Sequence, residues 1–444
     1  MRSARNRELI ALVPVALLLS AGFAGVFAQE EARLGDLSLV YGAYFLAVCF
    51  ATHIYLRLRL PSADPYLFPL VALLTAFGLV MVYRIDPDLA RDQANWFVLG
   101  LLLFALTIHF LRDYDVLERY RYTIAGAGLL LLLAPRLPGI GQQVNGAYLG
   151  VKIGPLAFQP AEFSKICIVV FLASYLREHR EVLIVGARRV LGVTLPPLKH
   201  LGPLLVVWGA SMFMLVFIRD LGSSLMFFAA FLALLYVATA RFSFVVIGMA
   251  MFSLGAWFFA STVPHVNDRI QTWLDPYQDP TASGYQILQS IFAQADGGLF
   301  GKGFGQALIT IPGTDTPLLP AAQTDTIYSL IVNEVGLFGA CAVILTYLLF
   351  AARGFKVALL ADDGFSKLLA TGLTAVFAIQ AFVIIGGVTR VIPLTGVTLP
   401  FVSYGGSSIV ANFVLLALLL LISDRARREA AAAARPGGLA MEPA

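Results

Sequence analysis

Charge is the scarcest property of this sequence. Only 13% of its 444 residues are Asp, Glu, Lys or Arg, whereas 59% are hydrophobic and the mean hydropathy is +0.81. An average soluble domain carries about 25% charged residues, so the solvent for this chain must be the bilayer. The net charge is only +4, and the basic residues are spread over short loops. This excludes the clustered basic face of a nucleic-acid-binding protein.

Cysteine and histidine are also rare. The three cysteines each lie within an apolar run, which excludes a disulfide framework and a CxxC metal pair. The five histidines are isolated and lack the spacing of metal ligands. The sequence therefore predicts no metal site built from these residues.

Long apolar runs, by contrast, are abundant. A membrane helix needs about 20 mostly apolar residues, and twelve runs qualify as candidate spans. They lie near residues 9–28, 37–58, 66–84, 94–111, 121–135, 162–177, 202–218, 221–239, 242–263, 325–352, 366–388 and 406–423. The sequence predicts an all-α fold, a polytopic transmembrane helical bundle of about twelve spans. The first run follows three arginines like a cleavable signal peptide, but its length exceeds the usual 7–15-residue apolar core of such peptides, which favours a retained helix.

The distribution of basic residues predicts the orientation of the bundle. With the N-terminus inside, the inner loops and tails carry 21 Lys and Arg and the outer loops carry 9; Lys165, within a span, completes the 31. Both termini are then cytoplasmic, including a short Ala/Gly/Pro-rich tail at 425–444. The longest loop, residues 264–324, lies on the outer face.

The outer loop has two notable segments. Residues 285–296 show the apolar spacing of an amphipathic helix lying on the membrane surface. The glycine-rich run at 297–305 fails the P-loop pattern, because Asp296 and Gly303 stand where Gly and Ser/Thr are required. We interpret it as a flexible glycine turn, with phosphate contact by its amides and Lys302 as the alternative.

Ionisable residues inside spans are costly, at about 2.5–3.5 kcal/mol each at a helix centre, and usually functional. Glu162 and Lys165 share one helix face just after Pro160, which suits a first helical turn. A substrate-lining pair and a mutually neutralised structural pair both fit this pattern. Four more ionisable residues lie at or within span ends: Asp220, Asp325, Glu334 and Arg390.

Four stretches carry a family resemblance. They are FQPAEFSK at 158–165, RDLGSSL at 219–225, WLDPYQDPTASGYQILQSIFAQADGGLFGKGFG at 273–305 and IPLTGVTLPFVSYGGSS at 392–408. Over about residues 66–423 the chain resembles the SEDS family (shape, elongation, division and sporulation), the FtsW/RodA group of cell-wall polymerases, and most of all its actinobacterial RodA-like members. Since the SEDS core typically has ten transmembrane helices, residues 1–62 are expected to be an added N-terminal hairpin and 63–424 the polymerase core.

The resemblance implies a peptidoglycan glycosyltransferase of the bacterial plasma membrane, with its active site on the outer face. Its substrate would be lipid II, a disaccharide-pentapeptide on undecaprenyl pyrophosphate, and its partner a class B penicillin-binding protein. The family has an essential aspartate in a "DP…GYQ" element of the outer loop. Asp275 and Asp279 are both candidates, and Asp279 matches because it precedes Pro280 and the SGYQ turn. Glu162 and Lys165 match the family's QPxExxK motif.

Three secondary motifs depart from the family pattern. The usual GARRW-like stretch reads GAYLG at 146–150, with Lys152 as the nearest cation. The usual HTD is QTD, ending at Asp325, and the usual EE pair is Asn333-Glu334. These departures leave reduced or altered activity open, whereas Asp279 is intact.

Glycosyl transfer from a pyrophosphate needs a base on the acceptor hydroxyl and positive charge on the departing phosphates. We assign Asp279 as the base and Lys165 as a phosphate contact oriented by Glu162. The further substrate-binding candidates are Asp325, Glu334, Arg390 and Lys302. A divalent cation, Mg²⁺ or Mn²⁺, is expected to bind with the pyrophosphate rather than as a tightly bound cofactor. Two alternatives remain: a transporter that flips lipid II, and a non-catalytic scaffold for a transpeptidase.

Overall fold

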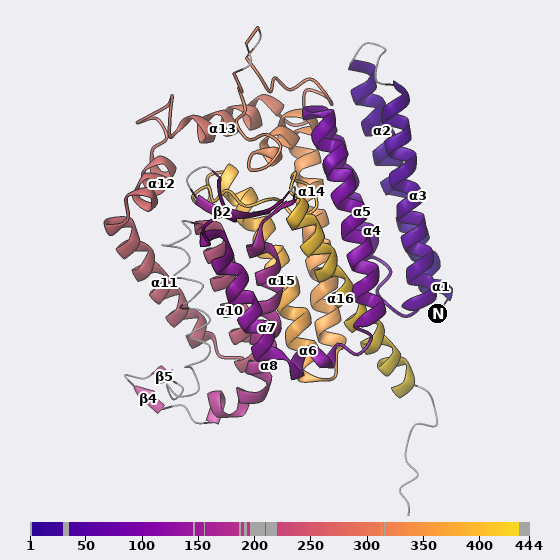
Figure 1. The fold of residues 1–444 in the computed structure, drawn as a ribbon, viewed down its shortest axis with the longest axis vertical. Helices are drawn as coiled ribbons and strands as arrows, with labels where there is room; N and C mark the ends of the chain where they lie inside the picture. The colour runs from indigo at the N-terminus through magenta and orange to yellow at the C-terminus, as the bar shows by residue number, and fades with distance from the viewer. Residues whose placement is uncertain are drawn as a thin grey trace, which may run out of the picture.

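Long helices run side by side along the longest axis of the molecule (Figure 1). The computed structural model describes residues 2–29, 35–144, 147–154, 156–185, 188–190, 193–195, 209, 220–311, 313–314 and 316–434. Within these residues, eight helices are long and apolar enough to cross a membrane. The predicted all-α bundle is therefore confirmed, while the count of twelve spans stays a prediction. The expected span at 202–218 lies, apart from residue 209, outside the described residues.

The helices match most of the expected spans. The N-terminal part contains α1 (Arg2–Ala11), α2 (Val13–Gln29), α3 (Gly35–Arg59), α4 (Leu67–Ile85), α5 (Pro87–Phe110), α6 (Asp115–Arg119), α7 (Arg121–Leu133) and α8 (Pro160–Val185). The C-terminal part contains α10 (Leu221–Thr239), α11 (Phe242–Thr262), α12 (Pro264–Leu274), α13 (Tyr285–Gly297), α14 (Ile327–Leu360), α15 (Gly364–Val388) and α16 (Gly406–Ala433). The amphipathic helix expected at 285–296 is present as α13. The span expected at 121–135 is α7, whose 13 residues are too few to cross the hydrocarbon alone.

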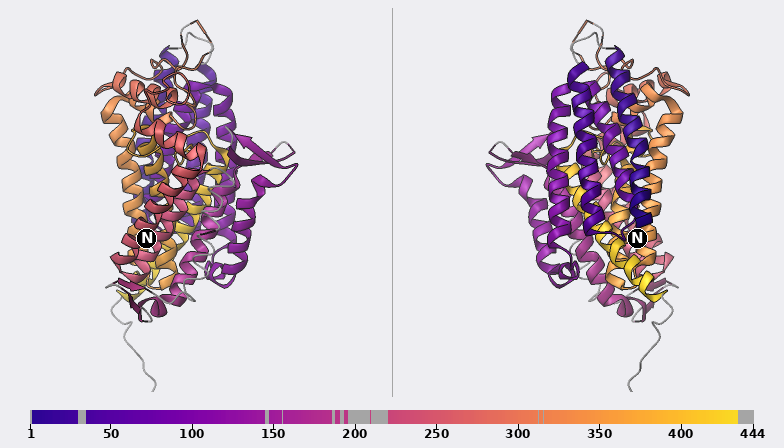
Figure 2. Two further views of the ribbon diagram at one scale, coloured as in Figure 1. Left: turned by 90° about the vertical axis from the view of Figure 1, so that its left-hand side faces the viewer. Right: turned by 90° about the vertical axis from the view of Figure 1, so that its right-hand side faces the viewer.

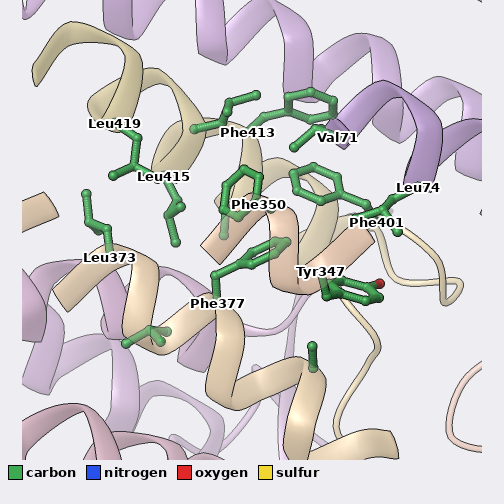
Figure 3. Packing of buried hydrophobic residues seen from close by; sticks show 14 of the residues in the cluster. Val71, Leu74, Tyr347, Phe350, Leu373, Phe377, Phe401, Phe413, Leu415 and Leu419 are labelled. Atoms are coloured by element: carbon green, nitrogen blue, oxygen red, sulfur yellow. The ribbon is translucent and has the colours of Figure 1, made fainter. Parts of the chain in front are cut away.

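Aromatic rings from three helices and one irregular segment form the centre of the bundle (Figure 3). The ring of Phe377 in α15 lies 4.2 Å from Phe350 in α14 and 5.9 Å from Phe401, centroid to centroid. Phe401 in turn lies 5.0 Å from Phe413 in α16. A Cβ on Gly100 of α5 would come within 2.6 Å of the Phe413 ring, so this glycine allows α5 and α16 to approach closely.

The segment between α15 and α16 is irregular although much of it is buried. Backbone polar groups inside a membrane protein must find partners within the protein, and Ser403 supplies several of them. Its hydroxyl donates to Thr324 O (2.7 Å) and accepts from Leu399 N (2.9 Å), while its carbonyl accepts from Gln93 Nε2 (3.0 Å). The segment is therefore fixed against both α5 and the residues before α14.

A small antiparallel sheet, which the sequence did not predict, projects from the side of the bundle (Figure 2). It comprises β1 (Gly141–Val144), β2 (Ala147–Ile153) and β3 (Leu156–Phe158) in the order β1-β2-β3. The GAYLG stretch that departs from the family pattern lies mostly in β2. There the Tyr148 ring packs under the Arg136 guanidinium at 4.1 Å. A second small antiparallel sheet pairs β4 (Arg188–Val190) with β5 (Val193–Leu195).

The glycine-rich run at 297–305 is bound to α14, so the prediction of a flexible turn is wrong. Gly336 interrupts α14 with φ +69°, and a Cβ there would lie 2.3 Å from Gly301 N. This opening exposes backbone groups that the loop satisfies. The hydrogen bonds run from Lys302 N to Asn333 O (2.9 Å), Gly303 N to Glu334 O (2.9 Å), Leu337 N to Gly298 O (3.0 Å) and Phe338 N to Leu299 O (3.2 Å). Two loop amides are thus used by α14 rather than offered to a phosphate.

Candidate functional site

A cavity of about 430 Å³, here called the polar cavity, lies at the end of the bundle that carries α12 and α13. Its walls come from these two helices, from the irregular segment 394–398, from β2 and from the residues preceding α8, α10 and α14. Its charged and most polar lining residues are Gln159, Asp220, Asp268, Arg269, Asp325 and Thr395. Residues far apart in the sequence thus meet around one space.

Four helices begin at the polar cavity, and one of them is α13, since Ser283 of the lining lies two residues before it. Gln159 and Asp220 directly precede α8 and α10, and Asp325 lies two residues before α14. A helix N-terminus carries partial positive charge from its unpaired N–H groups and favours anions. Asp220 already caps α10, because its carboxylate accepts from the backbone N (3.0 Å) and the hydroxyl (2.5 Å) of Ser223.

Burial dominates the electrostatics of the two carboxylates at these helix starts. It raises the pKa of Asp325 to about 6, with the positive charge of Arg269 acting in the opposite direction. Burial also raises the pKa of Asp220, opposed mainly by its bonds from Ser223. Asp325 therefore changes charge close to neutral pH, as groups at functional sites often do.

Arg269, on α12, is the residue that sequence reasoning missed. It is the one Lys or Arg among the described residues that line the polar cavity. One guanidinium nitrogen donates to Leu394 O (3.2 Å) and Thr395 O (3.3 Å). In the sequence it looks like an ordinary loop charge, and the one signal that could have indicated it is its position four residues before the WLDP stretch.

A second space of about 470 Å³, here called the apolar cavity, adjoins the first. It lies between α10, α11 and α12 and shares Arg269, Leu394 and Thr395 with the polar cavity. Most of its other lining residues are apolar, including Leu225, Phe252, Phe259, Ile270, Trp273 and Ile392. A molecule with a polar head and a hydrocarbon tail fits this pair of spaces.

Asp279, the predicted base, occupies an exposed turn between α12 and α13. Its carboxylate accepts hydrogen bonds from Ser283 N (3.1 Å), Ser283 Oγ (3.2 Å) and Ala282 N (3.2 Å). The bonds from Ser283 and its neighbours lower the pKa of Asp279, so the group is ionised at neutral pH. Asp279 is not among the described lining residues, but Ser283 is, which puts the turn at the cavity's edge.

Glu162 and Lys165 form the predicted pair, at 2.5 Å, inside the bundle. The Lys165 ammonium also donates to Gln380 Oε1 (2.7 Å) and Asn412 Oδ1 (3.1 Å), so all three of its protons have acceptors. Both side chains are at most 3% exposed, and neither lines the polar cavity in the described part of the chain. Gln380 extends the network by donating to Thr398 O (3.0 Å), which fixes the cavity wall.

The remaining candidates lie outside the polar cavity. Glu334 is buried in α14 and pairs with Arg84 at 3.3 Å. Lys302 pairs with Asp296 at 2.7 Å on the surface. Arg390 follows α15 and donates to the carbonyls of Trp273 and Leu274, at the end of α12. Of the predicted substrate-binding residues, Asp325 is therefore the one that lines the polar cavity.

No set of three or more His, Cys, Asp or Glu side chains that could hold a metal ion occurs among the described residues. Asp325 nevertheless offers a half-buried carboxylate to the cavity. A divalent cation bound jointly by one carboxylate and the phosphates of a substrate is compatible with this donor set.

Together, fold and cavities define a multi-pass membrane protein with an amphiphilic site at one end of the bundle. The family model of the FtsW, RodA and SpoVE cell cycle proteins matches residues 65–428. The chain belongs to this family, which confirms the resemblance seen in its motifs.

Several relatives have known names or structures. The chain is 41% identical to the peptidoglycan glycosyltransferase RodA of Mycobacterium tuberculosis, over 95% of this chain and 91% of the relative. It is 32% identical to the stage V sporulation protein E of Bacillus subtilis, over 82% and 98%. Among solved structures it is similar to a chain of a peptidoglycan synthase complex (TM-score 0.66, 27% identity, 82% and 98% covered) and to RodA of Thermus thermophilus (0.59, 25%, 82% and 98%).

Proposed function

We propose that this chain polymerises peptidoglycan glycan from lipid II. The observation that carries the proposal is the polar cavity next to the apolar cavity, with Arg269, Leu394 and Thr395 lining both. Lipid II has a sugar-diphosphate head on a long isoprenoid tail and needs both environments side by side. The RodA relatives are named peptidoglycan glycosyltransferases, and the protein is an enzyme of this class.

The reaction joins an acceptor sugar hydroxyl to the anomeric carbon of a donor. As the new C–O bond forms, the bond to the diphosphate breaks and its electron pair leaves with the phosphate oxygen. The hydroxyl proton passes to a base, for which we propose Asp279. Two features support this role: Asp279 is ionised at neutral pH, and it is bonded to Ser283 on the cavity lining.

Positive charge near the departing diphosphate is the second requirement. Lys165 was expected to supply it, but its three acceptors and its burial favour the structural alternative. A divalent cation held by Asp325 together with the substrate would neutralise phosphate charge. We propose this cation as a component that binds with substrate.

Purified protein in detergent, given lipid II, tests the function directly. A polymerase makes glycan strands there, because the reaction needs no membrane sidedness. A lipid II transporter or a transpeptidase scaffold makes none. Absence of strands from well-folded protein, with and without a partner, would overturn the proposal.

We further propose a class B penicillin-binding protein as the partner. Support comes from the similar chain that was solved within a peptidoglycan synthase complex. Co-purification from native membranes should recover a single-pass transpeptidase, and adding it should raise the polymerisation rate. If no such protein is recovered and adding one does not raise the rate, the pairing is contradicted.

The active site is proposed to face outward from the bacterial plasma membrane. Ser283 is exposed and lies on the polar cavity, so Ser283→Cys reports the side of the membrane on which the site opens. A membrane-impermeant maleimide should label it in intact spheroplasts, after Cys341, the exposed native cysteine, has been replaced by Ser. Labelling only after lysis would show that the site faces the cytoplasm and would contradict the proposed orientation.

A further inference from the structure

Two threonines that line the polar cavity have buried hydroxyls without a partner in the part of the chain that the structure describes. Thr395 Oγ1 and Thr398 Oγ1 are both buried, and neither has a hydrogen-bond partner among the described residues. Thr395 is 8% exposed and lines both cavities, and Thr398 lines the polar one. A buried hydroxyl without a partner lowers stability, so these two groups indicate a ligand that accepts hydrogen bonds.

Neighbouring side chains fix the backbone that carries these two threonines. Gly396, between them, has φ +73°, a conformation that favours glycine. Gln380 donates to Thr398 O at 3.0 Å and Arg269 donates to Thr395 O at 3.3 Å. The turn is therefore held from both sides, while its two buried hydroxyls have no partner among the described residues.

Arg269 gives this turn its charge. Its guanidinium lines both cavities, and the two carbonyl contacts that involve it, at 3.2 and 3.3 Å, are long and use one nitrogen. The other donors of the planar fork match the paired oxygens of a phosphate group. The starts of α8, α10 and α14 add partial positive charge around the same space.

We propose that Arg269, Thr395 and Thr398 form the binding site for the diphosphate of a polyprenyl-diphosphate-linked substrate, with its first isoprene units in the apolar cavity. The assignment rests on the proposed function. It names Arg269 as the protein side chain whose positive charge acts on the leaving group, beside the divalent cation proposed above. Asp220, Asp268 and Asp325 line the same cavity, and a Cβ on Gly396 would lie 3.6 Å from Asp325 Oδ2, so a divalent cation bound by Asp325 and the phosphates would lie beside this turn.

The test uses three amphiphiles with one tail: geranylgeranyl diphosphate, the monophosphate and geranylgeraniol. Their affinities are measured by thermal shift and by competition with lipid II, on the full chain in detergent. The wild type should bind the diphosphate at least tenfold more tightly than the alcohol. Arg269→Gln and Thr395→Val should each weaken diphosphate binding by about tenfold or more, as expected for a hydrogen bond to a charged group, and leave alcohol binding unchanged.

Thr395→Val is the decisive variant because it separates binding from folding. Removing a hydroxyl that has no partner should keep or raise the melting temperature, so weaker binding cannot be attributed to loss of structure. Arg91→Gln, which alters an exposed arginine on α5, is the matched control and should bind all three probes as the wild type does.

The outcomes distinguish this site from the proposed function. Glycan synthesis with unchanged diphosphate affinity in Arg269→Gln and Thr395→Val overturns the site and leaves the function standing. Diphosphate binding that depends on both residues, without glycan synthesis, supports the site and overturns the polymerase. Equal losses for diphosphate and alcohol also overturn the site, because they show a general change in the apolar cavity.

Discussion

The two ends of the bundle treat buried charge in opposite ways. At the end that carries α1, each buried carboxylate has a cationic partner: Glu8 contacts Arg5 and His53, Asp64 contacts Arg353 and Arg427, and Asp424 contacts Arg428. We call this set the closed cluster. The polar cavity is lined by the buried Asp220, the half-buried Asp325 and the exposed Asp268 together with one guanidinium, and no ion pair joins them among the described residues.

The difference separates structural charge from functional charge. Paired groups in the closed cluster hold the N-terminal hairpin and α16 together, and a ligand could add little to them. Carboxylates and hydroxyls without partners lower stability and are retained at sites where a ligand completes them. Replacing a charge in the closed cluster should therefore lower stability. Replacing one at the polar cavity should change activity or ligand binding without lowering stability.

The largest expected effect comes from the turn at the edge of the polar cavity. Asp279→Asn should reduce glycan synthesis from lipid II by about 10²–10⁴-fold, the usual contribution of a general base, with an unchanged melting temperature. Asn forms the same turn contacts, so the substitution should have no effect if Asp279 serves only to stabilise the turn. Asp275→Asn, whose carboxylate accepts from Tyr277 N in a similar turn, is the control. A wild-type rate for the Asp279 variant, or an equal collapse in both variants, would refute the assignment.

Next in size is the buried pair between the two ends. Lys165→Ala leaves Glu162 without its cation at 3% exposure, and breaking a buried pair costs about 3–5 kcal/mol. Thermal unfolding in detergent should show this loss. Apolar residues of similar volume at both positions, in Glu162→Leu with Lys165→Met, should recover most of it. If Lys165→Met alone folds normally but cannot polymerise, the pair has a direct role in the reaction and the structural interpretation fails.

A smaller loss is expected in the closed cluster itself. Asp64 is fully buried, while Arg353 and Arg427 are about a quarter exposed, so solvent screens the charges that remain. Asp64→Asn should cost about 1–3 kcal/mol of stability and leave the catalytic rate per folded molecule unchanged. Asp88→Asn, at an exposed pair on α5, should stay within about 0.5 kcal/mol. A changed catalytic rate for the Asp64 variant would contradict a purely structural cluster.

The last effect, of a size similar to that of Asp64→Asn, has the opposite sign and depends on pH. The folded chain binds a proton at Asp325 more tightly than the unfolded chain does, because burial raises its pKa from 3.8 to about 6. Ionisation therefore costs stability that is present below pH 4 and lost as the pH rises through 6. At pH 8 the free energy of unfolding of Asp325→Asn should exceed that of the wild type by about 1–3 kcal/mol. At pH 4 the two proteins should be equally stable. A constant difference across this range would exclude a raised pKa.

The helices could be predicted from the sequence because apolar runs of about 20 residues leave few alternatives in a bilayer. The family and the Glu162–Lys165 contact were equally accessible, from motifs and from helical spacing. The polar cavity was not: Arg269, Thr395 and Asp325 belong to three separate segments, and only tertiary packing brings them together. The β1–β3 sheet was missed because short strands leave no signal in a search for long apolar runs.

The break in α14 at Gly336 has a mechanical consequence. The loop at 297–303 is hydrogen-bonded to α14 on both sides of this break. The loop and this part of α14 are therefore expected to move together. The same loop continues α13, whose Gln286 and Ile287 line the polar cavity, while Leu345 and Leu348 face outward from α14. A displacement of α14 at this break would therefore also move the loop and the α13 residues that line the cavity.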